Sequence, residues 1–172
     1  MRAALVVACL AIATNAMSQT KQEYPGVTNF TRVDATIACG GATEVATLDN
    51  LKKDGFKTVI NLRVATEPGA NVEENQAKAK ALGLNYVHVP FSAGAPDAKV
   101  FDTVLATIAN KANQPVFIHC ASANRVGSVW LAKRVLQDNY SVEKATSEAK
   151  AIGLSNAGLE AFALQYINDH KK

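Results

Sequence analysis

Cys120 and Arg125 are the residues whose types and spacing could carry chemistry. Four small or polar residues separate them: Ala121, Ser122, Ala123 and Asn124. The apolar run 116–118 before the cysteine predicts a buried strand, and the residues after the arginine predict a helix. The thiol therefore lies at a strand end and the guanidinium at a helix start. Facing each other across a short loop, the two groups are suited to binding an anion.

Each part of this loop favours negative charge. The backbone N–H groups of residues 121–125 can turn inward as a nest, and the helix start adds free N–H groups and the positive end of its dipole. The planar fork of Arg125 can bind two oxygens at once. The same field favours the thiolate of Cys120, which is the nucleophilic form. We therefore predict that Cys120 and Arg125 are catalytic and that the four residues between them bind substrate. A buried, inert cysteine beside a surface arginine is the alternative.

Strand and helix patterns alternate along the chain and predict an α/β fold. Strands are expected at 36–39, 57–62, 86–89 and 116–119, and helices at 43–54, 71–83, 97–112, after 125, 141–153 and from 156. Thr43 is expected to cap the first helix, and Asn71 with Glu74 resembles a capping box. Nearly all-apolar strands indicate a three-layer α/β/α domain with a mainly parallel sheet of four to five strands. Cys39, Arg63, residues 91–97 and the Cys120 loop would then share the carboxyl edge, where such sheets bind ligands.

A family resemblance supports this interpretation. Residues 119–127, His-Cys-Ala-Ser-Ala-Asn-Arg-Val-Gly, resemble the phosphate-binding loop of the cysteine-dependent protein tyrosine and dual-specificity phosphatases. Residues 55–63 and 86–90 resemble the two preceding strands of that superfamily. The chain is most similar, over residues 28–152, to the bacterial beta-lactamase hydrolase-like phosphatase-like domain, which is also labelled a sulfur transferase. The resemblance implies that Cys120 attacks phosphorus, that Arg125 and the loop amides bind the phosphoryl oxygens, and that the Cys39 strand lies beside the Cys120 strand.

Three departures from the superfamily pattern leave the reaction open. The usual spacing between Cys and Arg in the superfamily is one residue longer. The bacterial branch shares the shorter spacing, and so do rhodanese-type sulfurtransferases. Val126 stands where phosphatases usually place Ser or Thr, and Ser128 is one turn position away. The general acid is not obvious: Asp97 follows the appropriate loop, although a helix N-terminal carboxylate is the plainer interpretation. Glu67 is a second candidate.

Other polar residues of this edge have two interpretations each. Arg63 could bind substrate charge or pair with Glu67. His119 is expected to pack behind the loop, and no recognisable metal-ligand spacing or cofactor motif is present. Cys39 is a possible redox partner, because a reversible bridge to Cys120 would switch off the nucleophile. A small buried hydrophobe is the other interpretation of Cys39.

The first residues indicate export. Arg2, the apolar run 3–13 and the small or polar residues 14–18 predict a signal peptide over 1–18, followed by a lead-in segment 19–30 and a single domain 31–172. Removing Arg2 from the 18 Lys and Arg leaves 17 against 15 Asp and Glu, a net charge of +2. This balance, without a basic run, argues against nucleic acid as a partner. We expect a periplasmic or secreted protein, free of the membrane after cleavage, that acts on a small anionic or phosphorylated substrate.

Three functions remain open from the sequence. The first is a phosphatase-like hydrolase of phosphomonoesters, with a phosphocysteine on Cys120. The second is a sulfurtransferase that carries a persulfide on Cys120. The third is a non-catalytic module that binds anions in the same loop.

Overall fold

The computed structural model describes residues 20–171, and the predicted signal peptide, which includes Cys9, lies outside the described residues. Within residues 20–171 the strands are β1 (Thr20–Lys21), β2 (Thr31–Arg32), β3 (Ile37–Gly40), β4 (Thr58–Asn61), β5 (Asn85–His88) and β6 (Val116–His119). The helices of the same range are α1 (Thr47–Lys53), α2 (Val72–Leu82), α3 (Ala98–Ala109), α4 (Asn124–Leu136), α5 (Val142–Ile152) and α6 (Ala157–His170), with a 3₁₀ turn at Lys111–Asn113.

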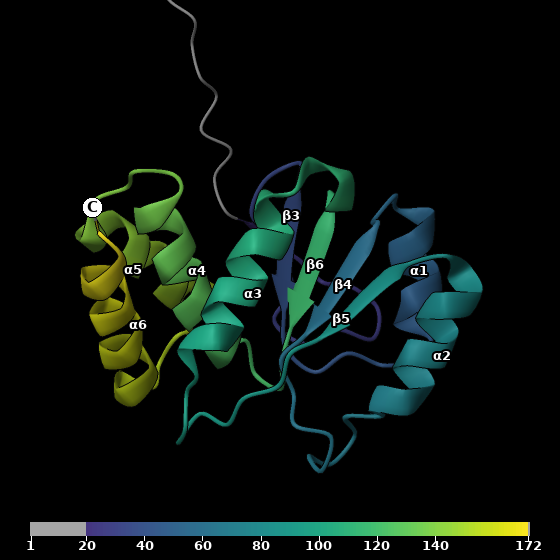
Figure 1. Ribbon diagram of the computed structural model, residues 1–172. Helices are drawn as coiled ribbons and strands as arrows, with labels where there is room; N and C mark the ends of the chain where they lie inside the picture. Colours follow the sequence, from purple (N-terminus) through teal and green to yellow (C-terminus); the bar gives the residue numbers. More distant parts are fainter. Residues whose placement is uncertain (1–19, 172) are drawn as a thin grey trace, which may run out of the picture.

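One sheet lies between two groups of helices (Figure 1). The strand order is β1-β2-β3-β6-β4-β5, and β3, β6, β4 and β5 are mutually parallel. The predicted three-layer class and mainly parallel sheet are confirmed, and so is the position of β3 beside β6. The predicted count of four to five strands is too low, because β1 and β2 add an antiparallel pair at one edge. Strands of two residues are too short to produce an alternating pattern, so only their pairing reveals them.

The segment predicted as an irregular lead-in packs on the sheet. Residues 20–30 contribute β1, and Phe30 is buried. The Tyr24 ring stacks on Phe30 with centroids 4.4 Å apart, and Phe30 in turn stacks on Phe117 of β6. This part of the chain therefore belongs to the same hydrophobic core as the domain that follows it.

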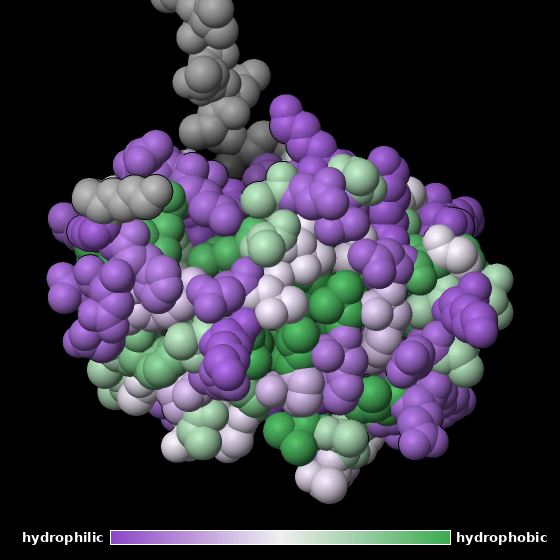
Figure 2. Space-filling view, viewed as in Figure 1, coloured by the Kyte–Doolittle hydropathy of each residue, from purple (hydrophilic) through white to green (hydrophobic). Residues whose placement is uncertain are grey.

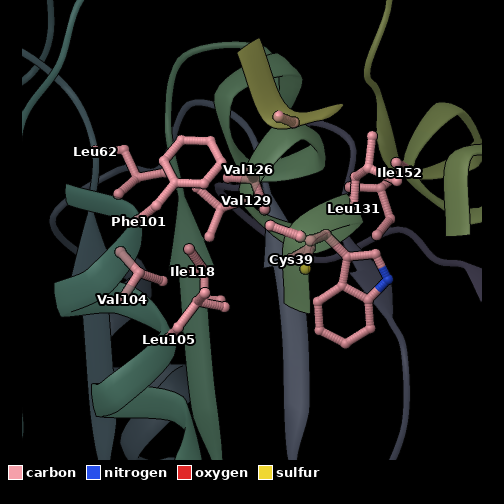
Figure 3. Packing of buried hydrophobic residues seen from close by; sticks show 14 of the residues in the cluster. Cys39, Leu62, Phe101, Val104, Leu105, Ile118, Val126, Val129, Leu131 and Ile152 are labelled. Atoms are coloured by element: carbon pink, nitrogen blue, oxygen red, sulfur yellow. The ribbon is translucent and has the colours of Figure 1, made fainter. Parts of the chain in front are cut away.

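Alternate residues of β6 enter different cores. Val116, Ile118 and Cys120 face a large cluster beneath α3–α6, whereas Phe117 faces a smaller cluster beneath α1 and α2. Figure 3 shows Ile118 among the α3 side chains and Cys39 beside the α4 side chains of the large cluster. Because both faces of the sheet are covered, every residue of β3, β4 and β6 is buried.

Helix boundaries follow local hydrogen bonds. The predicted starts of the last two helices at Ser141 and Asn156 are confirmed, and each of these side chains caps its helix by accepting a bond from an N–H of the first turn. The predicted Thr43 cap is wrong: its hydroxyl donates to the Gly41 carbonyl, and the helix begins only at Thr47. The predicted capping box at Asn71 is also wrong, because this residue has a left-handed backbone and its side chain makes no cap bond.

The parallel strands end toward the bottom of Figure 1, where the loops 63–71 and 89–97 emerge. In the same view, Figure 2 shows apolar side chains between α2 and α3, over β5. Among the described strands, β5 lies at the edge of the sheet and pairs with β4 alone. In the described part of the chain, no helix is long and apolar enough to span a membrane. Because β3, β4, β5 and β6 are parallel, the loops that follow them share one edge of the sheet, as predicted.

Candidate active site

The loop between β6 and α4 is short and tightly packed. Cys120 is only 1% exposed, and Ala123, at the N-cap of α4, has the left-handed φ of 69°. The α5–α6 connection lies in close contact with this turn: a Cβ added to Gly153 would lie only 3.0 Å from the Ala123 Cβ. A Cβ on Gly127 would lie 2.8 Å from the Leu154 Cβ. These two glycines allow the start of α4 to approach the connection closely, and this contact fixes the loop.

The amides of the loop are free of protein acceptors. None of the backbone N–H groups of residues 121–126 donates a hydrogen bond to any residue in the range 20–171. The first of these groups belong to the loop and the last to the first turn of α4, whose dipole is positive at this end. Uncommitted N–H groups at a helix start form an anion site. The predicted nest is therefore formed by the backbone.

The carbonyls and side chains of the same loop are occupied elsewhere. The Ala121 carbonyl accepts a bond from the Ala42 N–H at 2.8 Å. The Asn124 amide nitrogen donates to the Ser155 hydroxyl at 2.8 Å, and its oxygen accepts bonds from the N–H groups of Ser155 and Asn156. Of the residues predicted to bind substrate, Ser122 is exposed and Ala123 is buried. Their contribution to an anion is consequently made through backbone N–H groups.

Arg125 is buried and held by one edge of its guanidinium. Nη1 donates to the carbonyls of Leu62 and Phe91, at 3.1 and 2.9 Å, and to Glu67 Oε1 at 2.6 Å. Nη2 donates to Glu67 Oε2 at 2.8 Å. Among the described residues, Nε–H has no hydrogen-bonded acceptor. The Nε/Nη2 edge therefore keeps the two-donor geometry that matches an oxyanion.

The ionised state of Arg125 is secured by its neighbours. Burial by itself lowers the pKa of the guanidinium, but the hydrogen bonds to Glu67 and the nearby Cys120 thiol raise the pKa above its ordinary value. The hydrogen bonds from Arg125 lower the pKa of Glu67 to about 2, against the opposing effect of burial. Glu67 is thus a fixed carboxylate. The suggestion that it acts as a general acid is wrong, because it remains ionised at neutral pH.

Arg63 belongs to the same clamp. Its Nε donates to Glu67 Oε2 at 3.3 Å, and Nη1 donates to the Gly69 carbonyl at 2.8 Å. The guanidinium is buried, and it does not line the hollow beside Arg125. Of the two interpretations of Arg63, the structure shows the salt bridge with Glu67. In place of the predicted contact with substrate, Arg63 fixes the carboxylate that in turn fixes Arg125.

A hollow of about 460 Å³ opens beside the loop. It is lined by Val64, Thr66, Glu67, Ser92, Ala93, Ser122, Asn124, Arg125 and Asn156. These residues come from the loops after β4, β5 and β6 and from the start of α6. The hollow is therefore a product of the shared carboxyl edge, and its charged groups are Arg125 and Glu67.

A family model identifies the family. The family model for the beta-lactamase hydrolase-like protein, phosphatase-like domain, matches residues 29–137. The chain belongs to this family. A Beta-lactamase hydrolase-like protein of Agrobacterium fabrum is 30% identical over 111 residues, which are 61% of this chain and 25% of that protein. The chain thus spans about a quarter of the length of this relative.

Solved structures show the same fold. The crystal structure of P. aeruginosa TpbA has a TM-score of 0.67 and 18% identity, covering 92% of each chain. The core catalytic domain of the PP-IP phosphatase SIW14 from S. cerevisiae has a TM-score of 0.68 and 23% identity, covering 83% of this chain and 87% of that one. Our protein is therefore a phosphatase-like domain with the fold of the cysteine-dependent phosphatases.

In this phosphatase-like domain, Asp97 is a helix cap. Its carboxylate accepts a hydrogen bond from the Lys99 N–H at 2.9 Å at the start of α3. Asp97 is exposed and does not line the hollow beside Arg125. Arg125 lies close enough to Cys120 for the two groups to interact, whereas Asp97 caps α3 and is not among the residues that line the hollow.

His119 and Ser128 support the loop from behind. Burial lowers the pKa of His119 to about 3, so the ring is neutral, and it stacks on Phe117 at 5.6 Å. Within residues 20–171 its Nδ1 has no hydrogen-bond partner. The Ser128 hydroxyl donates to the Arg125 carbonyl at 2.8 Å and is fully buried, so it is not free to assist a leaving thiolate.

Cys39 lies near the nucleophile on the same side of the sheet. It pairs with Ile118 in the β3–β6 ladder, and Cys39 and Cys120 belong to one core cluster. Both thiols are free and buried, and burial raises the pKa of Cys39. A bridge between the two cysteines stays a prediction.

The sequence analysis did not predict that Glu67 binds Arg125 as well as Arg63. The available signal was the four-residue spacing between Arg63 and Glu67, which indicated a local pair. That Glu67 also reaches Arg125 follows only from the parallel arrangement of β4 and β6.

Proposed function

We propose that this domain is an exported cysteine-dependent phosphatase that cleaves phosphomonoesters through a phosphocysteine on Cys120. The thiolate attacks phosphorus, and the bond to the leaving oxygen breaks with its electron pair on that oxygen. Water then attacks phosphorus, the phosphorus–sulfur bond breaks, and the electron pair returns to Cys120. The proton of the water passes to solvent.

The observation that carries the proposal is the set of uncommitted donors around one buried thiol. The N–H groups of residues 121–126 have no protein acceptor within residues 20–171. Arg125 Nη2 makes one hydrogen bond, to Glu67, which leaves its second N–H beside Nε–H. A ligand or water has to supply the acceptors of these donors, because an N–H group that is left unpaired away from water is costly. An anion with several oxygens, such as a phosphoryl group, fits this need. The donors also stabilise the charge that builds up on these oxygens in the transition state.

The partner is accordingly a small anionic or phosphorylated molecule. Export rests on the predicted signal peptide over 1–18 and would place the domain in the periplasm or outside the cell. The proposed substrate contacts only the loop and the walls of the hollow beside it, so no metal or organic cofactor is part of the proposal.

Sulfur transfer is the second candidate, favoured by the spacing of four residues between Cys120 and Arg125 and by the placement of Asp97 outside the hollow. In this reaction the Cys120 thiolate attacks the sulfane sulfur of thiosulfate, and the sulfur–sulfur bond breaks to release sulfite. Cyanide then removes the sulfane sulfur as thiocyanate and restores the thiolate. The same amides and Arg125 would hold the sulfonate oxygens.

One pair of assays separates the candidates. The full-length protein and Cys120→Ser are compared for phosphate release from an aryl phosphate and for thiocyanate formation from thiosulfate and cyanide, with Cys39→Ala as a matched cysteine control. Phosphate release that is lost only in Cys120→Ser supports the phosphatase. Thiocyanate formation with the same dependence supports sulfur transfer. Inactivity in both assays with retained phosphate binding indicates the non-catalytic module.

A further inference from the structure

We infer that this site acts on phosphoryl groups joined to weakly basic leaving groups of low charge, the class that includes acyl phosphates and the phosphates of acidic phenols. The inference rests on the proposed phosphatase function and specifies its substrate. It is carried by the ionisable groups that the sheet edge does and does not present to the hollow beside Arg125 and the loop that follows Cys120.

The hollow offers no group that can donate a proton to a leaving oxygen. Its one carboxylate, Glu67, is occupied on both oxygens: Oε1 accepts from Arg125 Nη1 and the Val64 N–H, and Oε2 accepts from Arg125 Nη2 and Arg63 Nε. A carboxylate held by two guanidinium groups and a backbone N–H is stabilised as the anion. Glu67 therefore positions Arg125 and does not act as a proton donor.

The loop that closes the other side of the hollow presents Ser92 and Ala93. Residues 91–96 contain no Asp, Glu or His. The Ser92 hydroxyl accepts a hydrogen bond from the Gly94 N–H at 3.2 Å, and the Ser92–Ala95 bridge folds the loop into a tight turn. Asp97 follows this turn and is bound to the Lys99 N–H at the start of α3. This loop thus contributes the hydroxyl of Ser92 to the wall of the hollow and no carboxyl group.

The remaining titratable groups near this edge do not line the hollow. His88 Nε2 lies 2.8 Å from the Arg63 carbonyl, and the buried His119 ring stacks on Phe117. Asp102 accepts a bond from the Tyr166 hydroxyl on α6. The residues outside the described range, 1–19 and 172, contain no Asp, Glu or His. No carboxyl or imidazole of this chain is therefore available in the hollow as an acid.

The first step leaves negative charge on the leaving oxygen. When the phosphorus–oxygen bond breaks, its electron pair stays on the leaving oxygen, and no protein proton compensates the new charge. A carboxylate or an acidic phenolate accepts this charge readily, whereas the alkoxide of a serine or a sugar does not. A positioned general acid typically contributes about 10²–10⁴ in rate. Substrates that need this contribution are disfavoured here.

The charge of the hollow limits the rest of the substrate. Arg125 is its one cation, and the other lining residues, apart from the committed Glu67, are uncharged. Arg63 is buried in its own contacts. One phosphoryl group can be bound by this set, but a second or third phosphate on the same molecule finds no partner. This favours acyl phosphates over polyphosphates, which also have weakly basic leaving groups.

The test is a leaving-group series on the full-length protein. We expect kcat/KM for 4-nitrophenyl phosphate to exceed that for phenyl phosphate by at least about 10²-fold, because the general acid contribution is absent. Acetyl phosphate should be cleaved readily after subtraction of the Cys120→Ser rate, and inositol hexakisphosphate should not compete. Asp97→Asn should change each value by less than about twofold. Ser92→Asp, which adds a carboxyl at the hollow, should raise the phenyl phosphate rate selectively and introduce a new alkaline limb in its pH profile.

Two results overturn the inference in distinguishable ways. Equal Cys120-dependent rates on phenyl and 4-nitrophenyl phosphate, with a tenfold or larger loss on phenyl phosphate in Asp97→Asn, would show that Asp97 is the acid. The proposed phosphatase function would then stand without the substrate class. Phosphate release that is unchanged in Cys120→Ser, or absent with every substrate, would remove both.

Discussion

Two loops of similar length at the same edge of the sheet differ in how many of their polar groups have hydrogen-bond partners within the protein. In residues 63–70, the side chain of Glu67 accepts bonds from the Val64 N–H and two guanidinium groups, and the Ala70 N–H donates to the Glu67 carbonyl. In residues 120–126, the N–H groups from 121 onward have no acceptor among the described residues. In the first loop the N–H groups of Arg63, Val64, Glu67 and Ala70 find acceptors within the protein. In the second loop those acceptors would have to come from an anion or from water.

The difference shows how the work is divided between the two loops. The loop 63–70 positions Glu67, and Glu67 binds the Nη1/Nη2 edge of Arg125, so that the Nε/Nη2 edge is directed elsewhere. The loop 120–126 supplies the thiol and the amides. Preorganisation of this kind lowers the cost of ordering donors when charge develops. Substitutions in the two loops should therefore differ in what they change: chemistry in one, and positioning in the other.

The largest effect should come from the nucleophile. Cys120→Ser should reduce kcat by on the order of 10³-fold or more, because a hydroxyl at this position has no base to activate it. Phosphate binding, measured by calorimetry, should persist because the amides and Arg125 are untouched. Comparable activity in Cys120→Ser would contradict the assignment of the nucleophile.

The next effect should come from Arg125. Arg125→Lys should lower kcat/KM by about 10²-fold, because an ammonium group cannot replace the two parallel donors of the Nε/Nη2 edge. Steady-state kinetics on an aryl phosphate measure the loss, and a thermal melt confirms that the variant is folded. A change of less than threefold in a folded variant would mean that this edge does not face the substrate.

Glu67→Gln should act through position. We expect about a tenfold fall in kcat/KM and a loss of about 1–3 kcal/mol in the free energy of unfolding at neutral pH, because hydrogen bonds to charged groups are removed. The pKa of Glu67 is lowered to about 2, so its stabilisation is fully present above about pH 4.5 and is lost as the pH falls toward 2. Urea unfolding at pH 7 and pH 3 should therefore separate wild type from variant at pH 7 more than at pH 3.

The exposed Glu73 offers a matched control for this variant. Glu73 lies in the first turn of α2 and carries the same charge. Glu73→Gln should leave both the kinetics and the pH dependence of unfolding close to wild type. If both variants behave alike, the clamp contributes nothing specific.

His119 should produce a smaller effect that is visible in pH dependence. The pKa of this buried ring is lowered to about 3, so below about pH 6.5 the unfolded chain binds a proton that the folded chain does not. Stability should fall by about 1.4 kcal/mol per pH unit as the pH decreases from 6 to 4. His119→Gln should remove this part of the slope, as measured by urea unfolding across the range. An unchanged slope would indicate that the ring is protonated in the folded state.

The smallest effect concerns Cys39. Mild oxidation should slowly convert Cys39 and Cys120 into a reversible bridge, slowly because both thiols are buried and the structure must open locally. Free-thiol counting on the chain beginning at Gln19 should show both thiols lost together, and reductant should restore activity. Cys39→Ser should keep the Cys120 thiol countable. Two free thiols in the oxidised wild type would rule the bridge out.

The sequence by itself determined the class of fold and the centre of the site. Apolar strands that alternate with amphipathic helices specify a covered parallel sheet, because no other arrangement buries both faces of such strands. Cys120, the small residues after it and Arg125 lie within six consecutive positions, so local geometry alone brings them together. These features could be predicted because their causes are local in the chain.

Only the tertiary structure decided the partners of these residues. Arg125 meets Glu67, 58 positions earlier, because β4 and β6 are adjacent and parallel. The β1–β2 pair likewise depends on the neighbouring β3 edge. Each of these contacts joins segments or boundaries whose separation in space is set by packing, and a residue pattern along the chain does not encode that separation.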